Sequence, residues 1–163
     1  MNAADKDFTQ TELDAFMDIA VQEAAKNKTL KEGGPFGCCV VSRKTREVVG
    51  RAHNQVLATN DPSAHAEIQA IRMACKHLNS HILKDCVLFT SAYCCPMCLS
   101  CVLWSRIDTV YFAADLSSAH DKGFDDQLFY DDLKKDSPTL VSLRKLPHPD
   151  AERVFFENSA HTY

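Results

Sequence analysis

Two short motifs, H-A-E and C-P-M-C, stand thirty residues apart and constrain this chain more than any other feature. His65 of the first supplies an imidazole, and Cys95 and Cys98 of the second supply two thiolates. These are three of the four ligands that Zn²⁺ prefers, and a site with three protein ligands keeps an open position, as catalytic zinc sites do. Glu67 follows the histidine by two residues and is available to move protons for a metal-activated water.

Both motifs are predicted to lie where helices begin. A loop with helix-capping residues at 60–63 precedes a predicted helix over 64–78, and Pro96 favours the first position of a second helix that ends near residue 106. The start of a helix carries partial positive charge and unpaired N–H groups, which stabilise thiolates. Two such helix starts, packed side by side on a sheet, would bring the three ligands to one point.

Two other interpretations of the C-P-M-C motif stay open. A C-x-x-C pair in a reduced protein also forms redox-active dithiols. A structural zinc site would need a fourth ligand, for which Cys94, Cys101 and His81 are available. The combination of both motifs, in this order, favours catalytic zinc.

The rest of the chain alternates between strand and helix patterns. Thr9 and Glu12 form a capping box that begins a helix over 9–27. Strands are predicted at 36–42, 47–56, 86–91, 109–114 and 140–145, with a last helix over 150–159. This order predicts the α/β class, as a three-layer α-β-α sandwich with a central mixed sheet of about five strands. A length of 163 residues fits a single domain over 1–163.

Composition limits the partners and the cellular compartment that are expected for this chain. The net charge is −4 and no Lys/Arg-rich run appears, so a nucleic-acid partner is not expected. No apolar run approaches the roughly 18 residues that a membrane span needs. The eight cysteines follow a polar start without a secretory signal, which indicates free thiols in a reducing compartment, and we expect the cytoplasm.

The chain resembles the cytidine-deaminase-like superfamily of zinc deaminases, and within it the small bacterial-type guanine deaminases. The resemblance covers almost the whole chain. The residues that carry it are G-G-P-F-G at 33–37, N-D-P at 60–62, A-H-A-E at 64–67, A-I-R at 70–72, T-S at 90–91, C-P-M-C at 95–98, Trp104, G-F-D-D at 123–126 and Tyr163. The zinc motifs indicate the superfamily, and the G-F-D-D stretch with the terminal tyrosine points to the guanine branch.

The resemblance implies a zinc-dependent aminohydrolase that converts guanine to xanthine and ammonia, with one Zn²⁺ per chain. It implies His65, Cys95 and Cys98 as metal ligands and Glu67 as the proton shuttle. It implies substrate contacts from Phe36, Asn54, Ala66, Trp104, Asp126 and Tyr163. It also implies a homodimer that exchanges the C-terminal segment, about 146–163, so that Tyr163 completes the pocket of the partner. Plain structural roles, in the core, in turns or at a chain end, stay open for Phe36, Trp104, Asn54, Asp126 and Tyr163.

One departure from the family pattern concerns the residues before Cys95. The family usually has Cys-Glu-Pro there, and this chain has Ala92-Tyr93-Cys94. This substitution of the family pattern makes the identity of the substrate less certain than the type of reaction. Guanosine, cytosine or an aminotriazine is the alternative substrate, a tRNA adenosine deaminase shares the zinc motifs, and a zinc-holding pseudoenzyme is the non-catalytic alternative.

Overall fold

The computed structural model describes residues 8–121 and 123–157. The chain divides into two compact units, Met1–Tyr130 and Asp131–Tyr163. The first unit contains the sheet and both zinc-ligand motifs. Among the described residues, no helix has the length and apolar character needed to cross a membrane.

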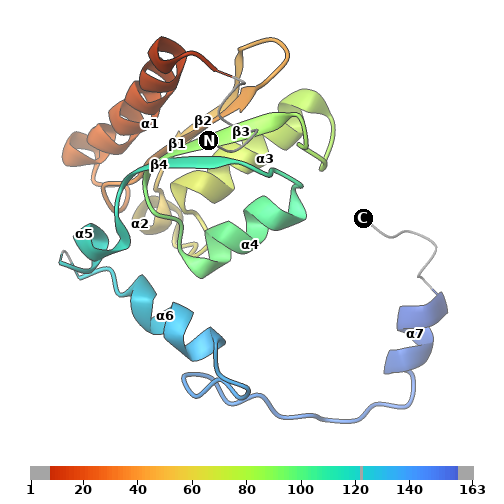
Figure 1. Cartoon of the computed structure of the whole chain (residues 1–163). Helices are drawn as coiled ribbons and strands as arrows, with labels where there is room; N and C mark the ends of the chain where they lie inside the picture. The colour runs from red at the N-terminus through yellow and green to blue at the C-terminus, as the bar shows by residue number, and fades with distance from the viewer. Residues whose placement is uncertain (1–7, 122, 158–163) are drawn as a thin grey trace. The chain divides into compact units, whose positions relative to one another are not determined.

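A mixed sheet forms the centre of the first unit (Figure 1). Its order is β2 (Val48–His53), β1 (Gly37–Ser42), β3 (Cys86–Ala92) and β4 (Val110–Ala114). β1 runs antiparallel to β2 and β3, whereas β3 and β4 are parallel. The mixed sheet is as predicted, but it has four strands in the part of the chain described, not five.

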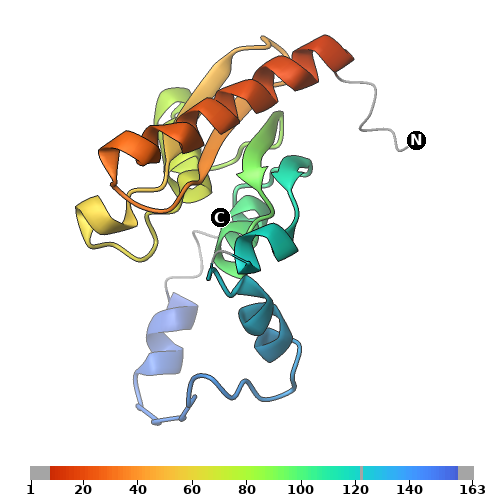
Figure 2. The same ribbon diagram turned by 90° about the vertical axis from the view of Figure 1, so that its left-hand side faces the viewer.

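Helix α1 (Gln10–Leu30) covers one face of this sheet (Figures 1 and 2). The predicted capping box is present, because Thr9 N–H donates to Glu12 Oε2 at 2.7 Å and Glu12 N–H donates to Thr9 Oγ1 at 3.3 Å. Phe16 and Ala20 pack on this face in one apolar cluster with Cys39, Val41, Val87 and Phe89. A Cβ on Gly37 would lie 2.2 Å from the carbonyl oxygen of Ala20, so only glycine permits this close approach of helix and strand.

The other face is covered by α3 (Ala66–Leu78) and α4 (Pro96–Trp104). Cys38, Val40 and Leu88 pack there with residues of both helices. Because side chains alternate along a strand, neighbouring apolar residues of β1 and β3 serve opposite layers. This explains the continuous apolar runs at 38–41 in β1 and 86–89 in β3, and it gives the predicted three-layer α-β-α arrangement.

The remaining helices are short: α2 (Val56–Thr59), α5 (Leu116–His120), α6 (Asp126–Leu133) and α7 (Ala151–Glu157). The predicted strand over 140–145 is wrong, since those residues form no strand. The Asp132 carboxylate accepts the backbone N–H groups of Thr139 and Leu140, at 2.9 Å and 3.0 Å, and so fixes a turn where the strand was expected to begin. Leu143 and Leu146 beyond it are exposed.

Candidate active site

The three predicted metal ligands come together at two helix starts. His65 is the N-cap residue of α3 and Cys95 is the N-cap residue of α4, both with extended backbone, while Cys98 lies in the first turn of α4. Their ligand atoms all lie within 4.8 Å of one another. The Cys98 N–H donates to Cys95 Sγ at 3.4 Å, which fixes the relative position of the two sulfur atoms.

The spacing of these atoms fits zinc. His65 Nδ1 lies 3.5 Å from Cys95 Sγ and 3.5 Å from Cys98 Sγ. Tetrahedral coordination, with Zn–S near 2.3 Å and Zn–N near 2.05 Å, separates a sulfur and a nitrogen ligand by about 3.5 Å. Of the residues that the structure describes, only these three form a possible metal-binding group, so Cys94, Cys101 and His81 supply no fourth ligand to it.

The protonation of the three groups is linked. The hydrogen bond with Cys95 raises the pKa of His65, and the hydrogen bond from the Cys98 thiol lowers the pKa of Cys95. Cys95 is therefore the first of the two thiols to ionise. Since metal ligation requires thiolates and a neutral imidazole, binding a cation here would release protons.

Glu67 lies beside this group and is 5% exposed. Thr90 Oγ1 donates to Glu67 Oε1 at 3.1 Å, and Cys98 Sγ lies 3.5 Å from Glu67 Oε2. Burial raises the pKa of the Glu67 carboxyl above its ordinary value. A raised pKa makes the ionised carboxylate a stronger base, which suits a group that must accept a proton and return it.

A cavity of about 490 Å³ opens onto these groups. His65, Glu67 and Cys95 line it, and so do three of the residues predicted to contact a substrate, Phe36, Asn54 and Asp126. Its size is in the usual range for a small-molecule site. The structure thus brings residues from five separate stretches of sequence to one cavity.

Asn54 is held in this cavity by its neighbours. Its Oδ1 accepts the Val56 N–H at 3.2 Å, and its carbonyl accepts Asn27 Nδ2 at 2.7 Å. A Cβ on Gly33 would lie 2.0 Å from Asn54 Oδ1, so glycine is needed beside it. These contacts fix the position of the Asn54 side chain at the cavity wall.

Aromatic rings and a carboxyl group form another part of the cavity wall. Phe36 and Phe124 meet edge to face with ring centroids 4.7 Å apart. A Cβ on Gly34 would lie 2.7 Å from the Phe36 ring, so this contact also depends on glycine. Asp126 begins α6 and is half-buried, and this burial raises the pKa of its carboxyl.

The departure before Cys95 places an aromatic side chain at the cavity. Tyr93 lines it and packs against Phe112 and Tyr130, with ring centroids 5.0 Å and 6.1 Å away. The Tyr130 hydroxyl donates to the Cys94 carbonyl at 2.7 Å. The Cys94 side chain is buried, which raises the pKa of its thiol, and it stands outside the metal-binding group found among the described residues.

Three predicted contact residues are not among those lining the cavity in the described part of one chain. Trp104 ends α4, about 12 Å along the helix axis from Pro96. Its side chain is 58% exposed, with the Arg106 guanidinium 5.8 Å from its ring. Ala66 is buried in the core cluster below the sheet. Tyr163 lies outside the described residues.

Val56, Leu57 and Phe124 are among the cavity-lining residues that were not predicted to contact a substrate. Val56 and Leu57 belong to α2, which is too short to show a helical period. Phe124 belongs to the G-F-D-D stretch, where only Asp126 was assigned a contact. The glycine at position 123 was the available sequence signal for a sharp turn there. In the structure Gly123 has a φ of 86°, which favours glycine.

Comparisons with known proteins agree with this geometry. The family described as the cytidine and deoxycytidylate deaminase zinc-binding region matches residues 10–114. Guanine deaminase of Bacillus subtilis is 41% identical over 122 residues, which is 75% of this chain and 77% of that protein. The X-ray structure of guanine deaminase from Bacillus subtilis superposes with a TM-score of 0.84 at 33% identity, covering 91% of this chain and 94% of the other.

Similarity extends to other deaminases over a shorter stretch. The tRNA-specific adenosine deaminase of Aquifex aeolicus is 39% identical over 99 residues, covering 61% of this chain and 64% of that protein. A crystal structure of a protein in complex with 2,6-diaminopurine superposes with a TM-score of 0.65 at 32% identity, covering 69% of this chain and 61% of the other. A purine is thus a ligand within the group of similar structures.

Proposed function

Because the chain belongs to the cytidine and deoxycytidylate deaminase zinc-binding family, we propose that it hydrolyses the free base guanine to xanthine and ammonia. The observation that carries this proposal is the shared cavity. His65, Cys95, Glu67, Asn54 and Asp126 line it, and Cys98, the third member of the zinc-compatible set, lies directly beside His65 and Glu67. The similar guanine deaminase structure supports the choice of base.

In this proposal the three ligands hold one Zn²⁺ per chain. When bound there, zinc supplies a water that is activated at neutral pH. Glu67 receives a proton from the attacking water and delivers it to the ring nitrogen beside C2. It then takes the remaining proton of that water from the new hydroxyl group on C2 and passes it to the amino group, so that the C2–N bond breaks, C2 becomes a carbonyl carbon and ammonia leaves. The hydrogen bond from Thr90 keeps the carboxyl aimed between metal group and cavity.

The remaining contacts select the base. Asn54 donates its NH₂ group to an acceptor on the purine, Asp126 accepts from purine N–H groups, and Phe36 packs on the ring. A site that hydrogen-bonds its substrate rejects analogues that leave those groups unpaired by up to about 10⁵-fold. Free bases with a different edge pattern are therefore poor substrates.

A panel of amines, assayed for ammonia release by zinc-loaded protein, tests this proposal. We expect turnover of guanine, and rates at least about 10³-fold lower in kcat/KM for cytosine and an aminotriazine. Guanosine and tRNA are the other members of the panel. Faster turnover of any of these four would replace guanine as the substrate. Zinc binding without turnover of any of them would indicate a pseudoenzyme.

The second unit supports the proposal of a homodimer with an exchanged C-terminal segment. Leu140, Val141, Leu143 and Leu146 are between 50% and 91% exposed. A short stretch of sequence with four exposed large apolar side chains favours burial against a partner. We assign that partner to a second copy, with residues 146–163 reaching its cavity and Tyr163 completing it.

The eight free cysteines, all within the described residues, support a reducing compartment such as the cytoplasm.

Removing residues 146–163 tests the exchange. We expect loss of the dimer and a decrease in guanine turnover of about 100-fold, because the partner's cavity loses its cover and its contacts. Zinc content should stay the same, since all three ligands are upstream. Light scattering, metal analysis and an ammonia assay on the truncated protein check this. A truncated dimer with full activity would contradict the exchange.

A further inference from the structure

One side of the cavity is built from three pieces of backbone that come from different places in the chain. They are the loop 33–36, Asn54 just after β2, and the two α2 residues Val56 and Leu57. All three line the same cavity, and we call them the rim. For a base to bind tightly, the rim must hold its shape before the base arrives, because ordering it on binding would weaken the affinity.

Helix α2 has little to hold it in place. It is four residues long, and each of them, Val56–Thr59, is at least partly exposed. Its N-cap residue Gln55 makes no side-chain capping bond. A helix of this length has no stability of its own in water, so contacts from elsewhere must keep it formed.

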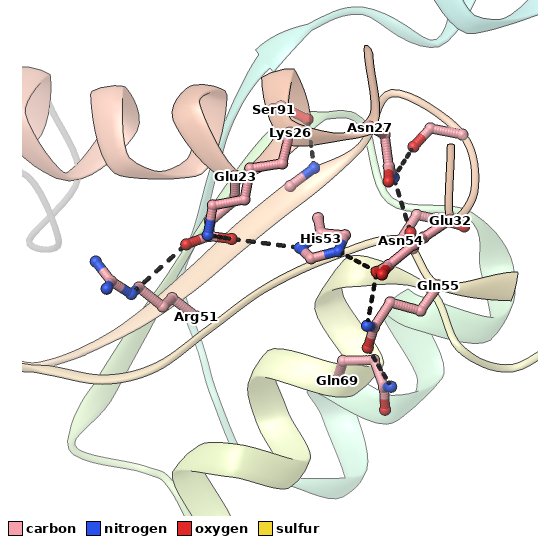
Figure 3. A network of polar contacts seen from close by, with 12 residues as sticks. Glu23, Lys26, Asn27, Glu32, Arg51, His53, Asn54, Gln55, Gln69 and Ser91 are labelled. Atoms are coloured by element: carbon pink, nitrogen blue, oxygen red, sulfur yellow. Dashed lines mark hydrogen bonds and ion pairs between the residues drawn. The ribbon is translucent and has the colours of Figure 1, made fainter. Parts of the chain in front are cut away.

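Glu32 supplies most of those contacts, in addition to the Val56 N–H that Asn54 Oδ1 accepts. Its backbone carbonyl accepts the N–H groups of Leu57 and Ala58, at 2.9 Å and 3.0 Å. Its carboxylate Oε2 accepts Gln55 Nε2 at 2.9 Å and His53 Nε2 at 2.7 Å (Figure 3). One residue, directly before the loop 33–36, thus ties that loop to the end of β2 and to α2.

The contacts of Glu32 with His53 connect the rim to helix α1. The His53 ring lies between two carboxylates, with Glu32 on one side and Glu23 on the other (Figure 3). Glu23 is 4% exposed and also meets Lys26 Nζ at 2.6 Å and Arg51 at 3.5 Å. Because Glu23 is buried and paired from both α1 and β2, it gives His53 a fixed position against the sheet.

Asn27 of α1 makes a second connection to the same rim. Its Nδ2 donates to the carbonyls of Gly34 and Asn54, each at 2.7 Å (Figure 3). These two carbonyls belong to two different pieces of the rim. Asn27 therefore fixes the loop and the end of β2 to each other, whereas α2 is held by Glu32 and by one hydrogen bond to Asn54 Oδ1.

We propose that Glu32 is a positioning residue for substrate binding, which holds α2 and the end of β2 against the loop 33–36 so that the base meets a formed rim. Glu32 is not among the cavity-lining residues that the structure describes, so it acts through Asn54, Val56 and Leu57. The inference rests on the proposed function in one respect: the bound molecule is a purine base. A role in overall stability alone would leave the affinity for that base unchanged.

Kinetics of two variants separate these roles. Glu32→Ala removes the carboxylate but keeps the backbone carbonyl, and we expect it to raise KM for guanine by about tenfold, the usual effect of losing a hydrogen bond to a charged group. Its kcat should stay within about threefold, and its zinc content should not change. Glu32→Gln keeps an acceptor oxygen, so its KM should lie between those of the wild type and Glu32→Ala. An unchanged KM in Glu32→Ala, or a fall in kcat alone, would overturn the proposal.

A matched control and a second observable complete the test. Glu47→Ala removes an exposed glutamate before β2 and should leave KM unchanged. Amide hydrogen exchange should be faster at residues 56–59 in Glu32→Ala and unchanged in α3. If Glu32→Ala does not fold, Gln55→Met removes the facing amide, and it should raise KM and quicken the same amides. Unchanged KM and exchange in Gln55→Met would then refute the role of Glu32.

The exchange measurement also separates this proposal from the proposed function. If wild-type protein loaded with zinc releases no ammonia from guanine, the proposed function fails. The exchange at residues 56–59 then decides whether Glu32 holds the rim: faster exchange in Glu32→Ala supports the proposal, and unchanged exchange overturns it.

Discussion

Replacing Glu67 with glutamine is expected to lower kcat for guanine by about 10³-fold, the usual contribution of a general acid and base. The amide keeps the size of the side chain and can still accept the hydrogen bond from Thr90 Oγ1. What it loses is the ability to take a proton from water and return it. Zinc content should stay unchanged, because the ligands are His65, Cys95 and Cys98 in our proposal. An ammonia assay with parallel metal analysis measures both quantities.

The same substitution has an expected effect on stability. Because burial raises the pKa of Glu67, ionising this carboxyl costs more free energy in the folded protein than in the unfolded chain. The stability lost in this way increases as the pH rises above the ordinary glutamate pKa, and a neutral amide avoids it. The thermal midpoint of zinc-free Glu67→Gln should therefore equal or exceed that of the zinc-free wild type. The kinetic prediction has its own contrary outcome: if zinc-loaded Glu67→Gln turned over guanine at the wild-type rate, Glu67 would have no part in the reaction.

The second large effect is expected for Cys98→Ser. Cys98 is fully buried, and its sulfur lies 3.5 Å from His65 Nδ1. Hydroxyl oxygen is not among the usual zinc ligands, and two ligands remain. Since loss of an outer-shell partner alone weakens metal binding by about 10- to 100-fold, loss of a ligand should weaken it by more than 100-fold and abolish turnover.

Two other cysteines provide matched controls for this prediction. Cys101 follows on the same helix and Cys94 precedes Cys95, and both stand outside the metal-binding group among the described residues. Cys101→Ser and Cys94→Ser should keep about one zinc per chain. Metal analysis and the ammonia assay on the three variants decide the matter. Cys98→Ser with full zinc and activity, or Cys94→Ser without zinc, would show that the ligand set is assigned incorrectly.

Features that depend on neighbours in the chain were predictable. The capping box of Thr9 and Glu12, the helix starts at the two motifs and the ligand spacing of C-x-x-C are set over three or four residues. Strand-like apolar runs located the four strands of the sheet, helical spacing of apolar residues located α1 and α3, and Pro96 marked the start of α4. The expectation of a strand over 140–145 failed because a single carboxylate, that of Asp132, binds the backbone there, and no hydrophobic pattern reports such a bond.

Which residues line the cavity could not be predicted from the sequence, because it depends on tertiary packing. Phe124 meets Phe36 across nearly ninety intervening residues, and Tyr93 reaches the cavity through its contacts with Phe112 and Tyr130. Glu32 shows no motif at all, yet it joins three pieces of the rim. The metal ligands could be predicted from the sequence because the spacing within each motif is set by the few residues at the start of one helix. The shape of the space beside it comes from segments that meet only when the layers pack, so its outline is known only from the folded chain.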